Sequence, residues 1–217
     1  MDPKLVVPTS LTLGNLLCGF LSAVHTARGE LPLAAWWILL AWLLDGLDGQ
    51  VARIVGSSTK FGAELDSLAD MTSFGLAPSL LLVGMYGTRA TAFSLVFIAC
   101  GAVRLAKFDA RRTQEKANFS GLPIPAAAWT LASYVLFPGG GTRWVALALA
   151  VLTGVLMLSH LEYDAMCFPL GSAWGKVKLS LFLGGALLVV LFPSYALFPL
   201  SLVYVASGPV RWLVSRG

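Results

Sequence analysis

The chain has 217 residues, of which 57% are hydrophobic and only 12% are charged, and its mean hydropathy is +0.79. Soluble domains carry about 25% charged residues, so this composition excludes an ordinary soluble protein and predicts an integral membrane protein. The net charge of +4 is explained by basic residues beside anionic lipid headgroups, and we expect no nucleic-acid partner.

Eight apolar runs approach the ~20 residues that a helix needs to cross a bilayer. We expect the first run to be a retained helix, because no cleavage pattern of a signal peptide follows it. Six of the runs are strong, whereas the fifth is short and the sixth lacks a sharp end. The sequence therefore predicts an all-α, polytopic transmembrane helical bundle of about eight spans, six core plus two, in a single domain over 1–217. The runs are 7–27, 32–53, 66–87, 90–110, 122–138, 143–160, 175–192 and 195–214.

The basic residues predict how the bundle is oriented. If the N-terminus is cytoplasmic, twelve of the fifteen Lys and Arg residues lie on the cytoplasmic side, and three, Arg28, Arg89 and Arg143, lie on the other. Basic residues are enriched on the cytoplasmic side of membrane proteins. We therefore expect a multi-pass protein of the cell membrane with both termini in the cytoplasm.

The second and third runs carry four aspartates within the stretch DGLDGQVARIVGSSTKFGAELDSLAD. Asp45 and Asp48 are three residues apart on one predicted helix, and Asp66 and Asp70 are four apart on the next, so each pair shares a helix face. A short link joins the two helices, which we expect to form an antiparallel active-site hairpin over 32–87. The cytoplasmic end of this hairpin then presents four carboxylates across the space between the two helices.

The predicted depth of the aspartates matches that of a lipid headgroup. Arg53 marks the expected cytoplasmic end of the second helix, and Asp45 lies about 12 Å from that level. Asp70 lies about 6 Å into the third helix when counted from Asp66. Glu64 points away from this face, and we expect it to be solvated. Because the aspartates are expected near the cytoplasmic boundary, we expect the site to face the cytoplasm.

Four close carboxylates in a partly dry site require cations, because repulsion and desolvation both disfavour the ionised form. Arg53 and Lys60 are too few and poorly spaced to supply them. Oxygen ligands select Mg²⁺, Mn²⁺ or Ca²⁺ over zinc, and two such ions suit displacement at phosphorus. The alternatives are a buried salt-bridge network or a proton relay.

Small residues accompany the carboxylates: Gly46, Gly49, Ala52 and Gly56 on the second predicted helix, and Gly62 and Ala63 before the third run. They allow close helix packing. They also leave room for a planar base or a diphosphate against the backbone. The two interpretations are compatible.

The spacing DxxDGxxAR, eight free positions, then GxxxDxxxD, resembles the signature of the CDP-alcohol phosphotransferase family, and every fixed position is matched. Members of that family transfer a phosphatidyl or similar group from a CDP-activated lipid to an alcohol and release CMP. The resemblance implies two divalent metal ions, Mg²⁺ or Mn²⁺, held by Asp45, Asp48, Asp66 and Asp70, with Asp70 as general base. It also implies a homodimer. The residues that it assigns to the cytidine diphosphate part are Gly49, Ala52, Arg53 and Gly62.

Two further stretches are similar to the phosphatidylserine synthases of this family: PTSLTLGNLLCG, from Pro8 to Gly19, and RLAKFD, from Arg104 to Asp109, running on to FSGLPIP. Thr9, Lys107 and Asp109 replace the residues usual there. The resemblance implies CDP-diacylglycerol as donor and L-serine as acceptor. Physically, serine requires a cation for its carboxylate, and the chain offers the basic cluster Arg104, Lys107, Arg111 and Arg112.

Other interpretations of these features stay open. The basic cluster can simply anchor the fourth predicted helix at the membrane surface. Thr12 and Asn15, three residues apart, can form hydrogen bonds toward the metal site or the acceptor, or they can be polar residues of a helix-packing interface. The acceptor can also be glycerol 3-phosphate or inositol phosphate. A divalent-cation transporter is the alternative from another class, although it predicts carboxylates near the midplane on several helices.

Overall fold

The computed structural model describes residues 3–55, 59–111, 121–139, 142–161, 163 and 191–214. Every regular element in these ranges is helical, which confirms the all-α class. The elements are α1 (Pro3–Ala27), α2 (Leu31–Val55), α3 (Lys60–Asp70), the π turn η1 (Met71–Leu76), α4 (Ala77–Tyr86), the 3-10 turn η2 (Gly87–Ala90), α5 (Thr91–Arg111), α6 (Ile124–Leu136), α7 (Arg143–Leu158) and α9 (Pro193–Val214).

Four helical segments in the described part are long and apolar enough to cross a membrane: Val7–Ala27, Leu31–Val51, Lys60–Ala110 and Pro193–Val214. These segments fit a multi-pass membrane protein. At 13 and 16 residues, α6 and α7 are shorter than a usual span. Most of the expected span 175–192 lies outside the described residues, so the number of eight spans is not confirmed.

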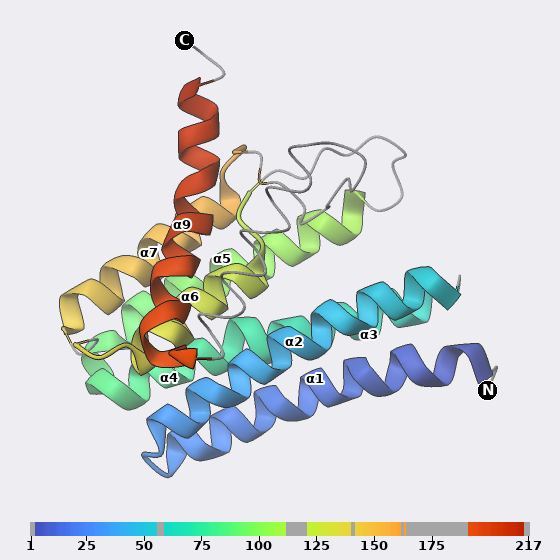
Figure 1. Cartoon of the computed structure of the whole chain (residues 1–217), viewed down its shortest axis with the longest axis horizontal. Helices are drawn as coiled ribbons and strands as arrows, with labels where there is room; N and C mark the ends of the chain where they lie inside the picture. Colours follow the sequence, from blue (N-terminus) through green and yellow to red (C-terminus); the bar gives the residue numbers. More distant parts are fainter. Residues whose placement is uncertain are drawn as a thin grey trace.

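Helix α1 runs alongside α2 (Figure 1). The turn between α1 and α2 contains Gly29, whose φ of 78° is readily adopted only by glycine. The chain turns back there, so α1 packs along α2 in antiparallel fashion. α1 also contacts α3, η1 and α4, and it thereby forms one wall of the space between α2 and α3.

The centre of the bundle is α6. It packs against α2, α7 and α9, and nearly all of its residues from Ile124 to Tyr134 are buried. Its small residues Ala126, Ala127 and Ala128 allow the neighbouring helices to approach closely. The fold therefore holds α2 firmly from the side opposite α1.

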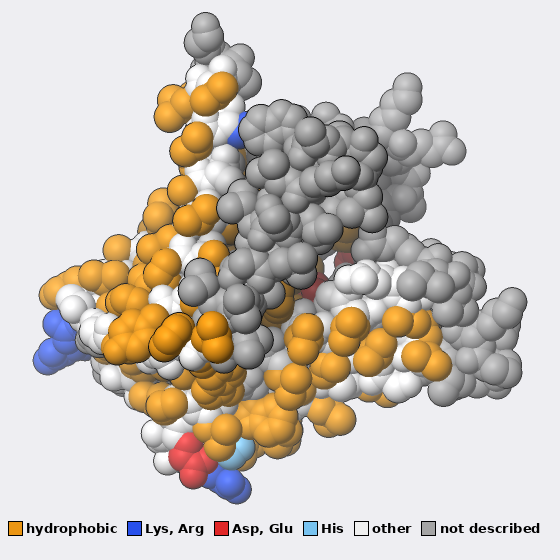
Figure 2. Space-filling view, in the orientation of Figure 1, with side chains coloured by type: hydrophobic (Ala, Val, Ile, Leu, Met, Phe, Trp, Pro, Cys, Tyr) orange, Lys and Arg blue, Asp and Glu red, His pale blue; other side chains and the backbone are white. Residues whose placement is uncertain are grey.

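The outward surface of the helices is apolar. Leu13, Leu17 and Phe20 of α1 are exposed, and hydrophobic side chains cover most of the described surface in the view of Figure 2. An aqueous solvent would disfavour so much exposed apolar area, whereas lipid chains accept it. This surface supports the prediction of a membrane protein.

The third helix differs from the prediction at its start. It begins at Lys60 rather than near residue 66, because Thr59 caps it with its Oγ1 accepting from the Gly62 N–H at 3.1 Å. Asp70 therefore lies about 15 Å along the helix from its first residue. The apolar run alone did not reveal this polar first turn.

Candidate active site

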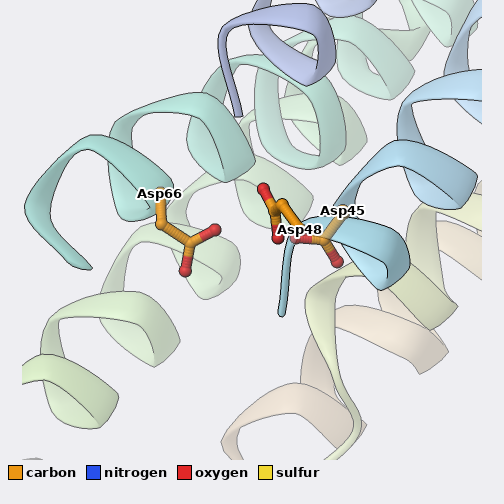
Figure 3. Close-up of side chains that lie close together, drawn as sticks. All are labelled: Asp45, Asp48 and Asp66. Carbon is orange, nitrogen blue, oxygen red and sulfur yellow. The ribbon is translucent and has the colours of Figure 1, made fainter. Parts of the chain in front are cut away.

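Three of the four predicted aspartates come together between α2 and α3. Asp45 and Asp48 stand on α2 and Asp66 on α3, and one carboxylate oxygen of each lies within 4.8 Å of those of the other two. Figure 3 shows Asp66 reaching from its helix toward the pair on the other. The hairpin predicted from the i, i+3 and i, i+4 spacings thus brings its carboxylates to one place.

Asp70 lies beside this group and is buried. Its carboxyl group lies close to that of Asp45. It also accepts a hydrogen bond from Asn15 Nδ2 at 3.3 Å on its Oδ1 atom. Asp70 is therefore part of the same site, on its α1 side.

Helix α1 forms the third wall of the site. Thr12 Oγ1 donates to Asp48 Oδ2 at 2.9 Å, and both side chains are buried. Thr12 thus contacts Asp48 on α2, and Asn15 contacts Asp70 on α3. The two side chains are three residues apart, on one face of α1. These hydrogen bonds join helices and also bring both side chains to the acidic group, so the two sequence interpretations stay open.

Basic charge near the site comes from α5. The guanidinium of Arg104 lies within electrostatic range of Asp70, and its Nε is buried without a hydrogen-bond partner in the described structure. Its one positive charge stands against four carboxyl groups. The site is therefore acidic, and additional positive charge would stabilise it.

The other predicted acceptor residues are only partly described. Lys107 is exposed, whereas the Arg111 side chain and Arg112 lie outside the described residues. Asp109 accepts a hydrogen bond from Ser67 Oγ at 3.0 Å. Glu64 is exposed near Lys60, with 3.9 Å between their charged groups, as expected for a solvated residue.

The residues predicted for the cytidine diphosphate part are only partly described. Gly49 follows Asp48 on α2, and Gly62 stands in the first turn of α3, where an added Cβ would lie 3.2 Å from Thr59 Oγ1. The backbones of Ala52 and Arg53 belong to α2, while their side chains lie outside the description. The nucleotide-binding role of these four residues stays a prediction.

The sequence interpretation missed two residues next to the site, Gly19 on α1 and Ser73 in the π turn. Ser73 Oγ donates to the backbone carbonyl of Asn15 at 2.8 Å, and Gly19 faces Ser73 at close range. Spacing could have found both. Gly19 falls four residues after Asn15 and Ser73 three after Asp70, on the faces that already carry the polar side chains.

The donor set fits divalent metal ions. Asp45, Asp48 and Asp66 supply hard carboxylate oxygens, the ligands that Mg²⁺ and Mn²⁺ prefer. A buried acceptor, Asn15 Oδ1, stands without a hydrogen-bond partner in the described structure, close to Asp70. The described part of the chain thus contains a cluster suited to metal-assisted chemistry at the edge of a membrane bundle.

Comparison with known proteins agrees with this site. The family model described as CDP-alcohol phosphatidyltransferase matches residues 5–156. A CDP-diacylglycerol–serine O-phosphatidyltransferase of Helicobacter pylori is 36% identical over 98% of this chain and 93% of its own. One of that name from Methanocaldococcus jannaschii is 35% identical over 94% of this chain and 92% of its own. An archaetidylserine synthase of Methanothermobacter thermautotrophicus is 36% identical over 73% of this chain and 70% of its own. The four aspartates of the signature all lie within the matched range, and the chain belongs to the CDP-alcohol phosphatidyltransferase family.

Proposed function

We propose that the protein transfers the phosphatidyl group of CDP-diacylglycerol to the hydroxyl of L-serine, giving phosphatidylserine and CMP. The observation that carries the proposal is the aspartate cluster of α2 and α3 in a chain whose relatives, similar over nearly their full length, are named for this reaction. The apolar exterior suits a donor whose acyl chains stay in the bilayer while its diphosphate reaches the cluster.

Asp45, Asp48, Asp66 and Asp70 would hold two divalent ions, Mg²⁺ or Mn²⁺. When bound, these ions neutralise the diphosphate and stabilise the charge on the departing CMP. Thr12 orients Asp48 through its hydroxyl, because a carboxylate with a fixed hydrogen bond presents its remaining lone pairs in one direction. We propose Gly49, Ala52, Arg53 and Gly62 as the contacts of the cytidine diphosphate part.

Asp70 is proposed as the general base. The serine hydroxyl oxygen forms a bond to the phosphorus of the phosphatidyl group, the bond from that phosphorus to the CMP oxygen breaks, and the hydroxyl proton passes to Asp70. The motif contains no Ser, Cys or His as a fixed position, which favours one direct displacement. Asn15, which bonds to Asp70, would keep its carboxyl group in place.

The acceptor end of the site is assigned to Arg104. It lies within electrostatic range of Asp70, so a carboxylate bound to Arg104 would hold a serine with its hydroxyl near the base. Lys107, Arg111 and Arg112 stay predicted contributors. A site facing the cytoplasm and a homodimer remain part of the proposal, and cross-linking in membranes would test the dimer.

The decisive experiment measures CMP release by the purified protein from CDP-diacylglycerol with Mg²⁺ or Mn²⁺. The acceptors compared are L-serine, glycerol 3-phosphate and inositol phosphate. We expect release that depends on serine, and no serine-dependent CMP above background would refute the assignment. An ether-linked donor compared with a diacyl donor in the same assay addresses the similarity to the archaetidylserine synthase.

A divalent-cation transporter is the second candidate function. The grouping of the carboxylates on one hairpin argues against it, because carriers use residues of several helices near the midplane. Uptake of Mn²⁺ by proteoliposomes, in the absence of CMP release, would favour transport.

A further inference from the structure

The helical rod that runs from Lys60 to Tyr86 changes its hydrogen-bonding pattern directly after Asp70. Residues Met71–Leu76 form a π turn, in which the Ala77 N–H bonds to the Thr72 carbonyl five residues back. Such turns are rare and occur frequently at functional sites. A π turn rotates the side chains before it relative to those after it, so its placement sets the direction in which Asp70 points.

Ser73 connects this turn to α1. The serine is fully buried, and its Oγ donates to the backbone carbonyl of Asn15 at 2.8 Å. The side chain of the same Asn15 donates to Asp70 Oδ1 at 3.3 Å. Asn15 is therefore bonded to the π turn through its backbone carbonyl and to Asp70 through its side-chain amide.

Gly19 allows the two backbones to come this close. A Cβ added at Gly19 would lie 2.4 Å from Ser73 Oγ and 2.7 Å from Ser73 Cα. Because the second of these atoms belongs to the backbone, no change of side-chain rotamer relieves the contact. Any larger residue at this position would therefore push α1 away from the π turn and disturb the bond between Ser73 and Asn15.

The Asn15 amide depends on this arrangement for its orientation. Asn15 is fully buried, and its Oδ1 has no hydrogen-bond partner among the described residues. Its bond to Asp70 is thus the contact in the described structure that directs the amide. The backbone position that Ser73 and Gly19 set then determines how the amide meets Asp70.

We propose that Ser73 and Gly19, with the π turn, form a positioning unit that orients Asp70 through Asn15 for proton removal from the acceptor. The inference rests on the proposed function, in which Asp70 is the general base. Ser73 and Gly19 themselves touch no reacting atom. Their effect should therefore appear mainly in turnover and leave substrate binding nearly unchanged, while metal binding, which Asp45, Asp48 and Asp66 also support, should weaken less than turnover falls.

The first test is Ser73→Ala in the full chain, with Ser133→Ala as matched control. Ser133 is also a buried serine that bonds to a backbone carbonyl, that of Thr130, and it lies on α6. We expect Ser73→Ala to lower kcat about 10-fold, since small misplacements of reacting groups cost up to about 10²-fold. The KM values for both substrates should change less than 2-fold, and the Kd for Mn²⁺ measured without substrate should rise by a smaller factor than the factor by which kcat falls. Ser133→Ala should leave kcat unchanged.

A double-mutant cycle separates positioning from loss of fold. We expect Asn15→Ala to lower kcat more strongly, and Ser73→Ala added to it to cause less than a further 2-fold loss, because the link to Asp70 is already broken. The effects of the two changes on the midpoint of thermal unfolding should instead add. Independent multiplication of the two kcat losses would overturn the proposal.

Gly19→Ala provides an independent variant, with Gly14→Ala on the same helix as control. A Cβ at Gly14 would meet only the flexible end of the Leu44 side chain, at 3.2 Å. We expect a kcat loss of about 10-fold for Gly19→Ala and none for Gly14→Ala. Equal kcat values for the two variants, or a loss that resides in KM, would overturn the inference.

The outcome for Asp70→Asn distinguishes a failure of the proposed function from a failure of the positioning unit. If Asp70→Asn stays active, the role of Asp70 as base is wrong and the proposed function requires a different base. If Asp70→Asn is inactive while Ser73→Ala and Gly19→Ala keep full kcat, the positioning unit alone is wrong.

Discussion

At the scale of single residues, the four aspartates of the site fall into two environments. Asp48 is buried and held by Thr12, and Asp70 is buried and held by Asn15, whereas Asp45 and Asp66 are partly exposed. A carboxyl group with a neutral hydrogen-bond donor and little water is well suited to exchange a proton. Asp48 and Asp70 both meet this criterion, and we propose Asp70 as the base because it lies outside the group formed by Asp45, Asp48 and Asp66.

The first prediction concerns Asp70→Asn. We expect CMP release to fall by about 10²-fold or more, the usual contribution of a general base, while Mn²⁺ binding is partly retained because Asp45, Asp48 and Asp66 remain. Single-turnover CMP release and Mn²⁺ titration measure the two effects. Glu64→Gln is the control, since Glu64 is an exposed acid of the same helix, and near-full activity of Asp70→Asn would contradict the assignment.

The second prediction concerns Thr12→Val, which removes the donor to Asp48 at nearly constant volume. Loss of a partner that orients a metal ligand weakens metal binding by about 10-fold to 100-fold. We therefore expect a higher Kd for Mn²⁺ by isothermal titration. Thr153→Val serves for comparison, because Thr153 is equally buried but bonds to carbonyls of its own helix, and a matching loss there would refute a specific role of Thr12.

At the scale of elements, proline shapes the last helix. Pro209 lies inside α9 and has no N–H, so the Val205 carbonyl four residues earlier lacks its helical donor. Tyr163 replaces that donor, with its hydroxyl bonded to the Val205 carbonyl at 3.2 Å. Its ring lies against Gly208, where an added Cβ would come within 2.4 Å of a ring carbon. The helix is thus held to the segment that follows α7.

The third prediction is that Tyr163→Phe lowers the free energy of unfolding by about 1 kcal/mol, the usual value of one internal hydrogen bond. The ring packing is kept, so the loss reports on the hydroxyl alone. Denaturant titration in detergent micelles measures it, with the exposed Tyr195→Phe as control. Equal stability of Tyr163→Phe and the wild type would show that the bond contributes nothing.

At the scale of the whole molecule, α1 packs along both α2 and α3, and the buried α6 packs against α2 (Figure 1). Lipid-facing side chains cover the outside of α1. The carboxylates are therefore gathered on two helices and braced by a third. A bundle of this kind presents a fixed acidic site while its exterior stays in lipid.

The fourth prediction concerns orientation. A single cysteine replacing the exposed Lys60 should react with a membrane-impermeant maleimide from the cytoplasmic side, and one replacing the exposed Arg89 from the opposite side. We expect these sides because twelve of the fifteen Lys and Arg residues would then lie in the cytoplasm, where basic residues of membrane proteins are enriched. A background with Cys18, Cys100 and Cys167 replaced by Ala avoids native thiols, and labelling of both positions from one side would contradict the orientation.

Much of the fold and site was predictable from the sequence, because the signals are local. Apolar runs long enough for a bilayer indicate membrane helices without knowledge of their neighbours. The spacing of Asp45 with Asp48 and of Asp66 with Asp70 follows from the helical repeat. The sequence by itself thus determined the membrane class, the all-helical class, the acidic residues on two successive helices and the family.

Only the tertiary structure decided which groups hold these carboxylates in place. Thr12 and Asn15 reach the site because α1 packs along both α2 and α3, and the spacing within α1 shows only that the two share a face, not which aspartate each one contacts. The π turn after Asp70 and the approach of Gly19 to Ser73 likewise depend on how two helices meet. Hydrogen bonds between distant segments form only after the bundle packs, and for that reason the environment of each aspartate is a property of the folded protein.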